Sequence, residues 1–595
     1  MCGMFGYVGT RDEAPQLVLA GLKKLEYRGY DSWGIAARQN GRLPARLLVE
    51  KHIGKIGQAT TELPSSTVAL GHTRWATHGG VTEANAHPHL DCGARLAVSH
   101  NGIIENHAEL RAELIAAGHT FESQTDTEVV CHLLEDELSQ DAEGGLIGAT
   151  MRVFRRLDGL SAISVLDRQA QCIAVAKNGS PLVLGQAADG NYLASDSSAL
   201  LDHTRRLTFL EDGEAALLEA DNVAVYDVAS GQRKAETRVW DIPWTVGGAE
   251  LGEFPDYMTK EMREQPGVLR AIAQQRSDDA AALARSILEA RSVYFVGCGS
   301  AAHAARWGEN LLARVAKLRS QAVVGSEFPY SVDFVDAHSL VVGLSQSGET
   351  IDLLENLVAA RQRGASLAAL VNVEGSSIYR LVDQPILLGA GPERCVLATK
   401  SFTAKLALLL LAAYAATDRL AAGRELVERA AREVDHFFGD GRYEQVRQLA
   451  QRIADRDHLY VIGRGPSYPL ALEAALKIKE VSYLHAEAFA GGEMKHGAIA
   501  LIEPGTPCLV LAPNDETFRA IVSGAQEIKA RGGYIIGISP SPSDVWDEHI
   551  HVADLGDATS IINALPPQVL AYELARQRGL DPDKPRNLAK SVTVR

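Results

Sequence analysis

The sequence predicts a multidomain α/β protein in which a unit of stacked sheets precedes two doubly wound parallel sheets. The chain has 595 residues, more than one hydrophobic core usually supports. Residues 1 to about 240 alternate short β-rich runs with turns, whereas strands in the second part alternate with long amphipathic helices. The second part also repeats itself, which indicates one βαβ-type unit present twice.

The first part contains β-rich runs such as "RLAVSHNGII", "CIAVAKNGSPLVLG" and "NVAVYDV", with two predicted helices. This pattern is typical of stacked sheets with helical cover. The stretch "WDIPWTVGGAELGEFPDYMTKEMREQP", rich in glycine and proline and ending at Pro266, is interpreted as a linker that leads into a helix. We therefore expect a first domain over residues 1–239 and a linker with a connecting helix over 240–281.

The repeat is visible in three matched segments. "YFVGCGSAAHAA" matches "YVIGRGPSYPLA", "LSQSGET" matches "APNDET", and "RQRGAS" matches "KARGGY", with offsets of 166 to 168 residues. The strands are short and apolar, as in parallel sheets covered on both faces. We expect the two copies over residues 282–421 and 446–585, followed by a C-terminal tail, 586–595.

The copies differ in the second matched segment. "SQSGET" offers hydroxyl groups, an amide and a glycine at a strand-to-helix turn, where backbone N–H groups and the helix dipole favour a phosphate. "PNDET" has proline and acids instead, which would repel an anion. Taken alone, "SQSGET" fits a helix cap as well as a phosphate cradle. The duplication favours a phosphate site in the first copy only.

Composition excludes several classes of function. Lys and Arg number 59 against 75 Asp and Glu, a net charge of −16 with no basic block, so nucleic acid is not an expected partner. The longest apolar run, "LALLLLAAYAA", has 11 residues, too few to span a membrane. No secretory signal pattern opens the chain, and the seven cysteines lack short spacing. We expect a cytoplasmic protein without disulfides, metal or cofactor.

The opening "MCG" places a cysteine directly behind the initiator methionine. If Met1 is removed, Cys2 becomes the first residue, and its α-amine, with a pKa of about 7.7–8.0, can act as base for its own thiol. Acyl transfer also needs an oxyanion hole, which Asn101 and Gly102 of "HNGIIENH" can supply. Arg74 and Asp126 can bind the charged groups of an amino acid. Each of these residues alone is common in structural roles.

Two sets of motifs carry a resemblance to known families. "MCG", "EYRGYDS", "GHTRWATHG", "NAHPH", "HNGIIENH" and "TDTEV" resemble the glutaminase half of the N-terminal-nucleophile amidotransferases, which implies an αββα layer fold. "LSQSGET", "ATKSFT", "ALKIKEVSYLHAEAF", "GGEMKHG" and "PRNLAKSVTV" resemble the paired sugar-isomerase (SIS) domains of the isomerising glutamine–fructose-6-phosphate aminotransferase family. The resemblance covers essentially the whole chain.

The resemblance implies a glutaminase site. Cys2 would attack the glutamine amide, Asn101 and Gly102 would hold the oxyanion, and Arg74 and Asp126 would bind the α-carboxylate and α-amine. The same pocket would include Trp75, Thr77, His78 and His87. Ammonia would pass through an internal channel, gated by Trp75, to the second site, which prevents its loss to water.

The resemblance also implies a sugar-phosphate site that transfers nitrogen to fructose 6-phosphate and yields glucosamine 6-phosphate, the first step of hexosamine synthesis. Lys590 would form a Schiff base with the open-chain ketose, and Glu480, one helical turn after Lys477, would shuttle a proton between C1 and C2. His496 would open the sugar ring from a neighbouring subunit, so at least a homodimer is expected. The remaining sugar-phosphate ligands would be Ser300, Ser345, Gln346, Ser347, Thr350, Val396 and Ala398.

Two departures from the family pattern bear on the substrate. "CGSA" stands where the family usually has "CGTS", and "VLAT" where it has "VAST", so Ala301 and Ala398 replace serines. A missing hydrogen bond of this kind costs about 0.5–1.5 kcal/mol. The alternatives are the same chemistry on a different ketose phosphate and a non-catalytic sugar-phosphate sensor. Phosphoribosylamine or asparagine synthesis is disfavoured, because no P-loop or pyrophosphate-type acidic motif follows the first half.

Overall fold

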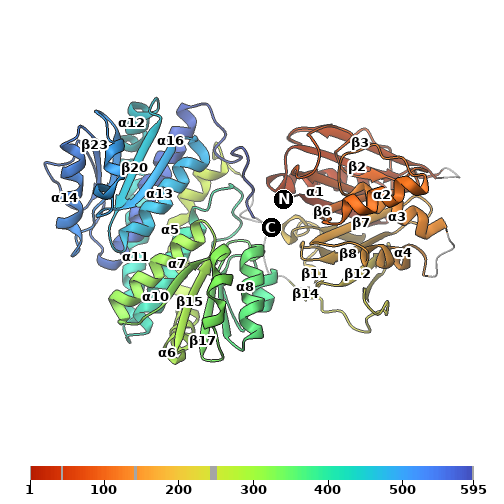
Figure 1. Ribbon diagram of the computed structural model, residues 1–595, viewed down its shortest axis with the longest axis horizontal. Coiled ribbons are helices and arrows are strands. Elements are labelled where there is room, and N and C mark those ends of the chain that lie inside the picture. Colours follow the sequence, from red (N-terminus) through yellow and green to blue (C-terminus); the bar gives the residue numbers. More distant parts are fainter. Residues whose placement is uncertain (1, 42–44, 140–143, 242–250, 592–595) are drawn as a thin grey trace. The chain divides into compact units, whose positions relative to one another are not determined.

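The computed structural model describes residues 2–41, 45–139, 144–241 and 251–591. The chain divides into two compact units, one of residues 1–247 with the C-terminal 591–595, and one of residues 248–590 (Figure 1). Each unit has its own sheets and its own hydrophobic core.

The first unit contains two antiparallel sheets. The larger sheet has, in spatial order, β14 (Trp240–Asp241), β11 (Arg206–Phe209), β9 (Val183–Ala187), β10 (Gly190–Ala194), β1 (Gly3–Gly9), β4 (Val68–Arg74), β2 (Ser32–Arg38) and β3 (Leu47–Ile53). The smaller sheet has β13 (Val223–Asp227), β12 (Glu214–Leu218), β8 (Ile173–Asn178), β7 (Ser161–Asp167), β6 (Leu96–Gly102) and β5 (His89–Leu90).

Helices cover the outer faces of both sheets. Leu70 and Ile173 belong to a core between the sheets, whereas Val18 of α1 (Ala14–Leu25) packs on the larger sheet. The smaller sheet is covered by α3 (Glu128–Ser139) and α4 (Gly145–Phe154). The layer order helix, sheet, sheet, helix confirms the predicted fold.

The expectation of two helices in the first unit is wrong, because its described residues form four α-helices, including α2 (His107–Ala117). Only Leu110 and Leu114 of α2 are buried, so this helix has little apolar periodicity to reveal it.

The helix that follows the first unit starts earlier than the linker pattern predicted. Helix α5 (Tyr257–Gln275) begins after Asp256, whose side chain accepts a hydrogen bond from the N–H of Thr259 at 2.8 Å. This N-cap satisfies one of the free N–H groups of the first turn. Pro266 therefore lies inside the helix instead of preceding it. Residues 242–250 of the predicted linker lie outside the described residues.

The second unit contains two parallel five-stranded sheets. One has β16 (Gln321–Val324), β15 (Ser292–Gly297), β17 (Ser339–Leu344), β18 (Ser366–Val371) and β19 (Gln384–Leu387). The other has β21 (His485–Ala490), β20 (His458–Gly463), β22 (Pro507–Leu511), β23 (Tyr534–Ser539) and β24 (Glu548–His551). The strand orders correspond, and Gly299 and Gly465 have the same φ of 54° after the matched strands β15 and β20. The predicted duplication is thus visible in the backbone.

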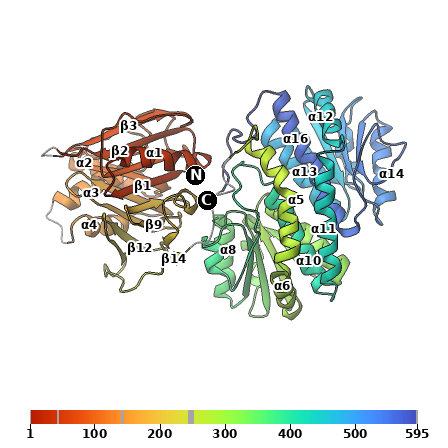
Figure 2. The same cartoon turned by 180° about the vertical axis from the view of Figure 1, so that it is seen from behind.

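Helices lie on both faces of each parallel sheet (Figures 1 and 2). In the first sheet Val341 packs toward α8, and Val342 packs toward α7 and α10. A single core connects the inner faces of the two sheets, with Phe295 and Val461 both part of it. The described helices are α6 (Ser277–Glu289), α7 (Ser300–Leu311), α8 (Ile351–Gln362), α9 (Ser377–Leu381), α10 (Lys400–Ala415), α11 (Leu420–Phe437), α12 (Arg442–Ile453), α13 (Ser467–Ser482), α14 (Phe518–Lys529), α15 (Thr559–Asn563) and α16 (Leu565–Gln577).

The strand order of the first parallel sheet creates a switch point. The chain leaves β15 toward β16 on one side, and β17 lies on the other side of β15. Connections of this kind open a crevice at the carboxyl ends of the two strands, where ligands of doubly wound sheets bind. The loops that follow β15 and β17 are therefore the place to look for a site.

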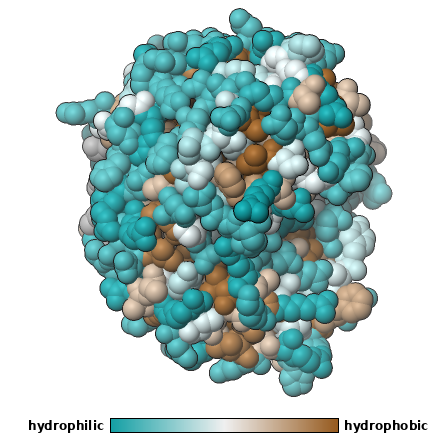
Figure 3. Space-filling view, turned by 90° about the vertical axis from the view of Figure 1, so that its left-hand side faces the viewer, coloured by the Kyte–Doolittle hydropathy of each residue, from teal (hydrophilic) through white to brown (hydrophobic). Residues whose placement is uncertain are grey.

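One face of the molecule is largely polar. Figure 3 shows a mostly hydrophilic face with scattered apolar side chains, as is normal for folded proteins. Among the described helices, none is both long enough and apolar enough to span a bilayer.

Candidate active sites

Cys2 lies directly before β1, on which Gly3 pairs with Thr73 of β4. The Cys2 thiol accepts a hydrogen bond from the backbone N–H of Trp75, with Sγ and N 3.2 Å apart. Burial raises the pKa of this thiol, and the Trp75 N–H and the Arg74 cation oppose that effect. Met1 lies outside the described residues.

Arg74, the last residue of β4, organises the loop that follows it. Its guanidinium donates to the carbonyl oxygens of Gly80 at 3.0 Å, of Gly79 at 3.3 Å and of His78. Asp31 of the "EYRGYDS" motif accepts from the N–H of Ala76 at 2.9 Å and so fixes the same loop. None of the hydrogen bonds that the described residues show for Arg74 involves a carboxylate. The carboxylates of Asp31 and Asp126 nevertheless lie near enough to act on its charge.

Asn101 and Gly102 end strand β6. The side-chain oxygen of Asn101 lies 3.0 Å from Nε2 of His72. Burial lowers the pKa of His72 to about 3, so this ring is neutral, and its Nε2–H donates to Asn101. The amide nitrogen of Asn101 is thereby directed away from His72. Gly102 has a φ of 129°, and a Cβ there would lie 1.9 Å from the carbonyl oxygen of Leu160.

The other predicted glutamine-binding residues surround the same strand ends. Asp126 is buried and accepts from the N–H of Ile104 at 2.9 Å. His87 is also buried, with Nε2 at 2.8 Å from Thr127 Oγ1, and burial holds its pKa well below the usual value. The 75–80 loop carries the last three, Trp75, Thr77 and His78.

The second unit has a pocket of about 150 Å³ at the predicted switch point. Its walls come from the loops after β15 and β17, the loop before α10, helix α13 and the C-terminal tail. Both repeats thus contribute to one cavity. The lining residues are Cys298, Ser300, Ala301, Leu344, Ser345, Gln346, Ser347, Thr350, Val396, Ala398, Lys405, Lys477, Glu480, Leu588, Ala589 and Lys590.

The "SQSGET" loop joins β17 to α8 at one wall of this pocket. Ser345 Oγ accepts from the N–H of Gly348 at 3.0 Å and lies 3.0 Å from Thr350 Oγ1. Gly348 has a φ of 69°, and a Cβ there would lie 2.0 Å from Ser376 Oγ, so the turn requires glycine. Thr350 occupies the N-cap position of α8 without a side-chain cap bond. This geometry favours the phosphate-cradle interpretation over a simple helix cap.

Helix α13 brings Lys477 and Glu480 to the same pocket. Lys477 Nζ lies 2.6 Å from Glu480 Oε2 and 3.4 Å from Glu473 Oε1, as the spacing of one helical turn predicted. Burial lowers the pKa of Lys477, but the two carboxylates outweigh it and raise the pKa overall. The amine therefore stays charged beside Glu480.

Lys590 reaches the pocket from the tail. Its Nζ lies 2.7 Å from Glu393 Oε2 and 3.1 Å from the carbonyl oxygen of Leu397. Burial alone would raise the pKa of Glu393, but the Lys590 cation and hydrogen bonds from Ser401 lower it to about 2. A lysine near the end of the chain is thus anchored by a fully buried carboxylate, so it is not a solvated tail charge.

Among the residues predicted for the sugar-phosphate site, His496 alone does not line this pocket. It is exposed on the 3₁₀ helix η6 (Met494–His496). Its position outside the pocket of its own chain is what a contribution from a neighbouring subunit requires.

Comparisons with known proteins agree over the whole chain. A glutamine amidotransferase domain family matches residues 51–223, and the SIS domain family matches residues 286–415 and 452–576. The chain is 40% identical to the glutamine–fructose-6-phosphate aminotransferase (isomerizing) of Thermus thermophilus and 39% identical to that of Thermococcus kodakarensis, each over 100% of both chains. The chain belongs to the isomerising glutamine–fructose-6-phosphate aminotransferase family.

The second unit is also similar to solved structures. The C-terminal domain of glucosamine-fructose-6-phosphate aminotransferase from Francisella tularensis is 29% identical, with a TM-score of 0.52 over 56% of this chain and 99% of that chain. Tagatose-6-phosphate ketose/aldose isomerase from Escherichia coli, at 19% identity, shares the fold, with a TM-score of 0.50 over 56% of this chain and 96% of that chain.

Both departures from the aminotransferase family pattern fall in the pocket. Ala301 and Ala398 are among its lining residues, so the two absent hydroxyl groups would have faced this pocket.

Sequence reasoning missed three residues of these sites. His72 lies inside the quoted "GHTRWATHG" motif, two residues before Arg74 and on the same side of β4. Lys405 lies in the apolar helix α10, and burial lowers its pKa to about 8. Glu393 lies in a loop far from Lys590 in sequence, and no local pattern signals their pairing. Only the "ATKSFT" motif pointed to the neighbourhood of Lys405.

Proposed function

We propose that this chain transfers the amide nitrogen of glutamine to fructose 6-phosphate and isomerises the product to glucosamine 6-phosphate, with release of glutamate. The arrangement of one cavity is the main support for this activity. A single cavity collects a serine-rich anion loop, a Lys477–Glu480 pair and Lys590 from three distant segments. The relatives that match the full chain bear the name of this activity.

In the glutaminase step, Cys2 attacks the side-chain amide carbon of glutamine, and the carbonyl oxygen becomes an oxyanion. The Asn101 amide and the Gly102 N–H stabilise that charge. Ammonia leaves as the C–N bond breaks, and water then hydrolyses the thioester to glutamate and free thiol. Arg74 binds the α-carboxylate and Asp126 the α-amine, while Trp75, Thr77, His78 and His87 enclose the substrate.

Removal of Met1 supplies the base in this scheme. The freed α-amine of Cys2, with a pKa of about 7.7–8.0, accepts the thiol proton near neutral pH. The raised pKa of the buried thiol explains why a dedicated base is needed. Ammonia then travels through a sequestered channel gated by Trp75, whose ring packs edge-on against Tyr30 at 5.6 Å between centroids.

In the sugar step, the "SQSGET" loop and Ser300 bind the phosphate, with Val396 and Ala398 on the wall beside it. His496 of a second copy opens the furanose ring. Lys590 forms a Schiff base with the C2 ketone and releases water, and ammonia displaces the lysine to leave an imine at C2. Glu480 moves a proton from C1 to C2, with Lys477 beside it to stabilise its charge. We therefore propose a homodimer or a higher homo-oligomer.

The proposed setting is the cytoplasm. All seven cysteines are free thiols, which suits a reducing compartment.

The direct test is an assay of both products in one reaction. Purified protein with glutamine and fructose 6-phosphate should give glutamate and glucosamine 6-phosphate in equal, sugar-dependent amounts. The Cys2→Ala variant should lose glutamate formation but keep sugar-phosphate binding, measured by calorimetry. Glutamate without aminosugar, or loss of both functions in Cys2→Ala, would contradict the proposal.

A second candidate function is the same chemistry on another ketose phosphate, and Ala301 and Ala398 in the pocket favour testing it. Competition between fructose 6-phosphate and other ketose phosphates separates the two. If another ketose phosphate is aminated at a kcat/KM at least about tenfold higher, the two alanines mark a changed sugar preference. A protein that binds sugar phosphate without forming any product would be a sensor.

A further inference from the structure

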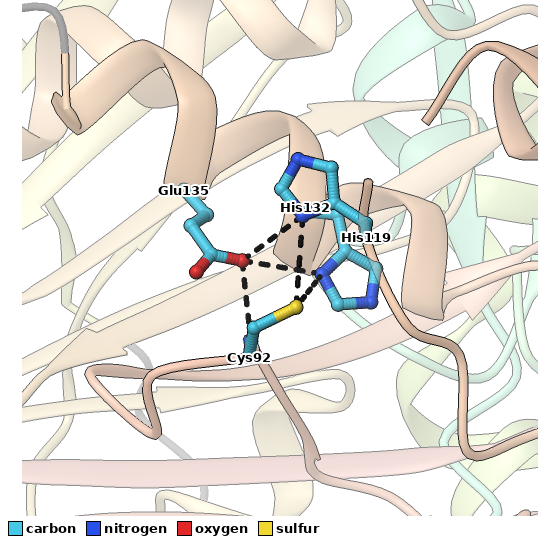
Figure 4. Close-up of side chains that lie close together, drawn as sticks. All are labelled: Cys92, His119, His132 and Glu135. Carbon is cyan, nitrogen blue, oxygen red and sulfur yellow. Dashed lines mark hydrogen bonds and ion pairs between the residues drawn. The ribbon is translucent and has the colours of Figure 1, made fainter. Parts of the chain in front are cut away.

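Four side chains in the first unit converge on one point that the proposed reaction does not use. Cys92 follows β5, His119 follows α2, and His132 and Glu135 lie one turn apart on α3 (Figure 4). One atom from each, the thiol sulfur, two imidazole nitrogens and a carboxylate oxygen, lies within 4.8 Å of the other three. These are the atom types that bind zinc in proteins.

The distances match the edges of a zinc coordination sphere. Cys92 Sγ lies 3.6 Å from His119 Nδ1 and 3.5 Å from His132 Nδ1. Glu135 Oε2 lies 3.3 Å from each of the same two nitrogens. With Zn–S of about 2.3 Å and Zn–N and Zn–O of about 2.0–2.1 Å, a tetrahedral ion gives S···N edges of about 3.5 Å and N···O edges of about 3.3 Å. Four of the six edges of the tetrahedron agree with these values before any ion is placed, and the other two, sulfur to oxygen and nitrogen to nitrogen, are within 4.8 Å.

The outward nitrogens of both histidines face carboxylates. His119 Nε2 lies 2.9 Å from Asp136 Oδ1, and His132 Nε2 lies 3.7 Å from Glu128 Oε1. His119 can therefore donate its outer N–H to Asp136 and present an unprotonated Nδ1 inward, a pairing typical of zinc-bound histidines, whereas 3.7 Å is too long for a hydrogen bond from His132 to Glu128. Glu128 is itself held by the backbone N–H groups of Glu122 and Ser123, each at 2.7 Å.

We propose that Cys92, His119, His132 and Glu135 bind one Zn²⁺ ion. On binding, the Cys92 thiol releases its proton to solvent and coordinates as thiolate. Four protein ligands fill a tetrahedral sphere, so the site is structural and leaves no position for a substrate. Cys92 is exposed, which gives the ion a path from solvent.

The ion would hold together segments that are distant in sequence. It would join the end of β5, the turn after α2 and the middle of α3, and so close the segment between His119 and His132. That segment contains Asp126, so a link to glutamine binding rests on the proposed function, whereas metal binding itself does not. The ligands are separated by 26, 12 and 2 residues, and this wide spacing is why the sequence predicted no metal site.

Metal content tests the proposal. The full-length protein, without a histidine tag, is stripped with chelator, given one equivalent of ZnCl₂, desalted and analysed for zinc. We expect about one zinc per chain, and at least about tenfold less in Cys92→Ser. The matched control is His52→Asn, which removes an exposed histidine of the same unit that contacts Glu50 and the Trp33 ring and should retain full zinc.

A second measurement tests whether the Cys92 thiolate is a metal ligand. Titration with Co²⁺ should give a thiolate-to-cobalt charge-transfer band in wild type and in Cys2→Ala, but not in Cys92→Ser. Thermal melts of each variant without metal show that all are folded. Equal zinc in wild type and Cys92→Ser, or a cobalt band that disappears with Cys2 instead of Cys92, would overturn the proposal.

Discussion

At the scale of single residues, orientation of polar groups decides what the glutaminase site can do. Asn101 can serve an oxyanion only if its NH₂ group, and not its carbonyl, faces the substrate. The neutral His72 sets that orientation, because its Nε2–H donates to the Asn101 oxygen at 3.0 Å. His72 is therefore a positioning residue that acts through Asn101.

Replacement of His72 tests this role. His72→Leu removes the donor, so we expect glutaminase kcat to fall by about 10²–10³ with little change in KM, as for loss of an oxyanion-hole group. His72→Gln, which can donate to the same oxygen, should recover part of the loss. Kinetics of glutamate release check both variants. Equal losses of kcat in His72→Leu and His72→Gln, or a change in KM alone, would show that His72 has another role.

At the scale of elements, helix α5 is hydrogen-bonded to the loop that contains Glu393. Glu261 of α5 is buried and accepts from the backbone N–H groups of Arg394 and of Cys395, the latter at 3.1 Å. Burial, together with the neighbouring Glu393 carboxylate, raises the pKa of Glu261 to about 8. The folded protein thus holds a proton that the unfolded chain releases above about pH 4.3.

The contribution of Glu261 to the free energy of unfolding depends on pH. Because the folded-state pKa is raised, the stabilisation is complete below about pH 4.3 and is lost as pH rises through about 8. Glu261→Gln keeps the acceptor oxygen but cannot ionise. Relative to wild type, its free energy of unfolding should rise by up to about 1.4 kcal/mol per pH unit between about pH 5 and pH 8. Denaturant unfolding at several pH values checks this, and parallel curves would contradict it.

Sequence patterns predicted the elements well where local signals were strong. The duplicated strand-loop-helix units, the "SQSGET" turn and the Lys477–Glu480 pair each depend on residues close in sequence, and the structure has them as expected. Two helices were expected in the first part where the described residues form four, and α2, which buries only two leucines, has little apolar periodicity to indicate a helix. The Lys590–Glu393 pair and the Cys92 cluster join residues from distant segments, so tertiary structure alone brings them together.

At the scale of the whole molecule, His496 bears on assembly. Because it lies outside the pocket of its own chain, we expect variants His496→Ala and Lys590→Ala to be inactive alone but to complement each other when subunits exchange. Random exchange in a dimer would restore about a quarter of wild-type aminosugar synthesis. Native mass spectrometry verifies that mixed dimers form. Mixed dimers without activity would show that His496 acts in its own subunit or not at all.

Under the proposed function, one chain passes nitrogen from glutamine to a ketose phosphate. The most direct measurement supplies glutamine labelled with ¹⁵N in the side-chain amide, fructose 6-phosphate and an excess of unlabelled ammonium, and determines the mass of the product. We expect glucosamine 6-phosphate that carries ¹⁵N almost completely, because the proposed reaction sequesters the released ammonia from the ammonium in solution. Product with mostly unlabelled nitrogen, or no aminosugar at all, would contradict it.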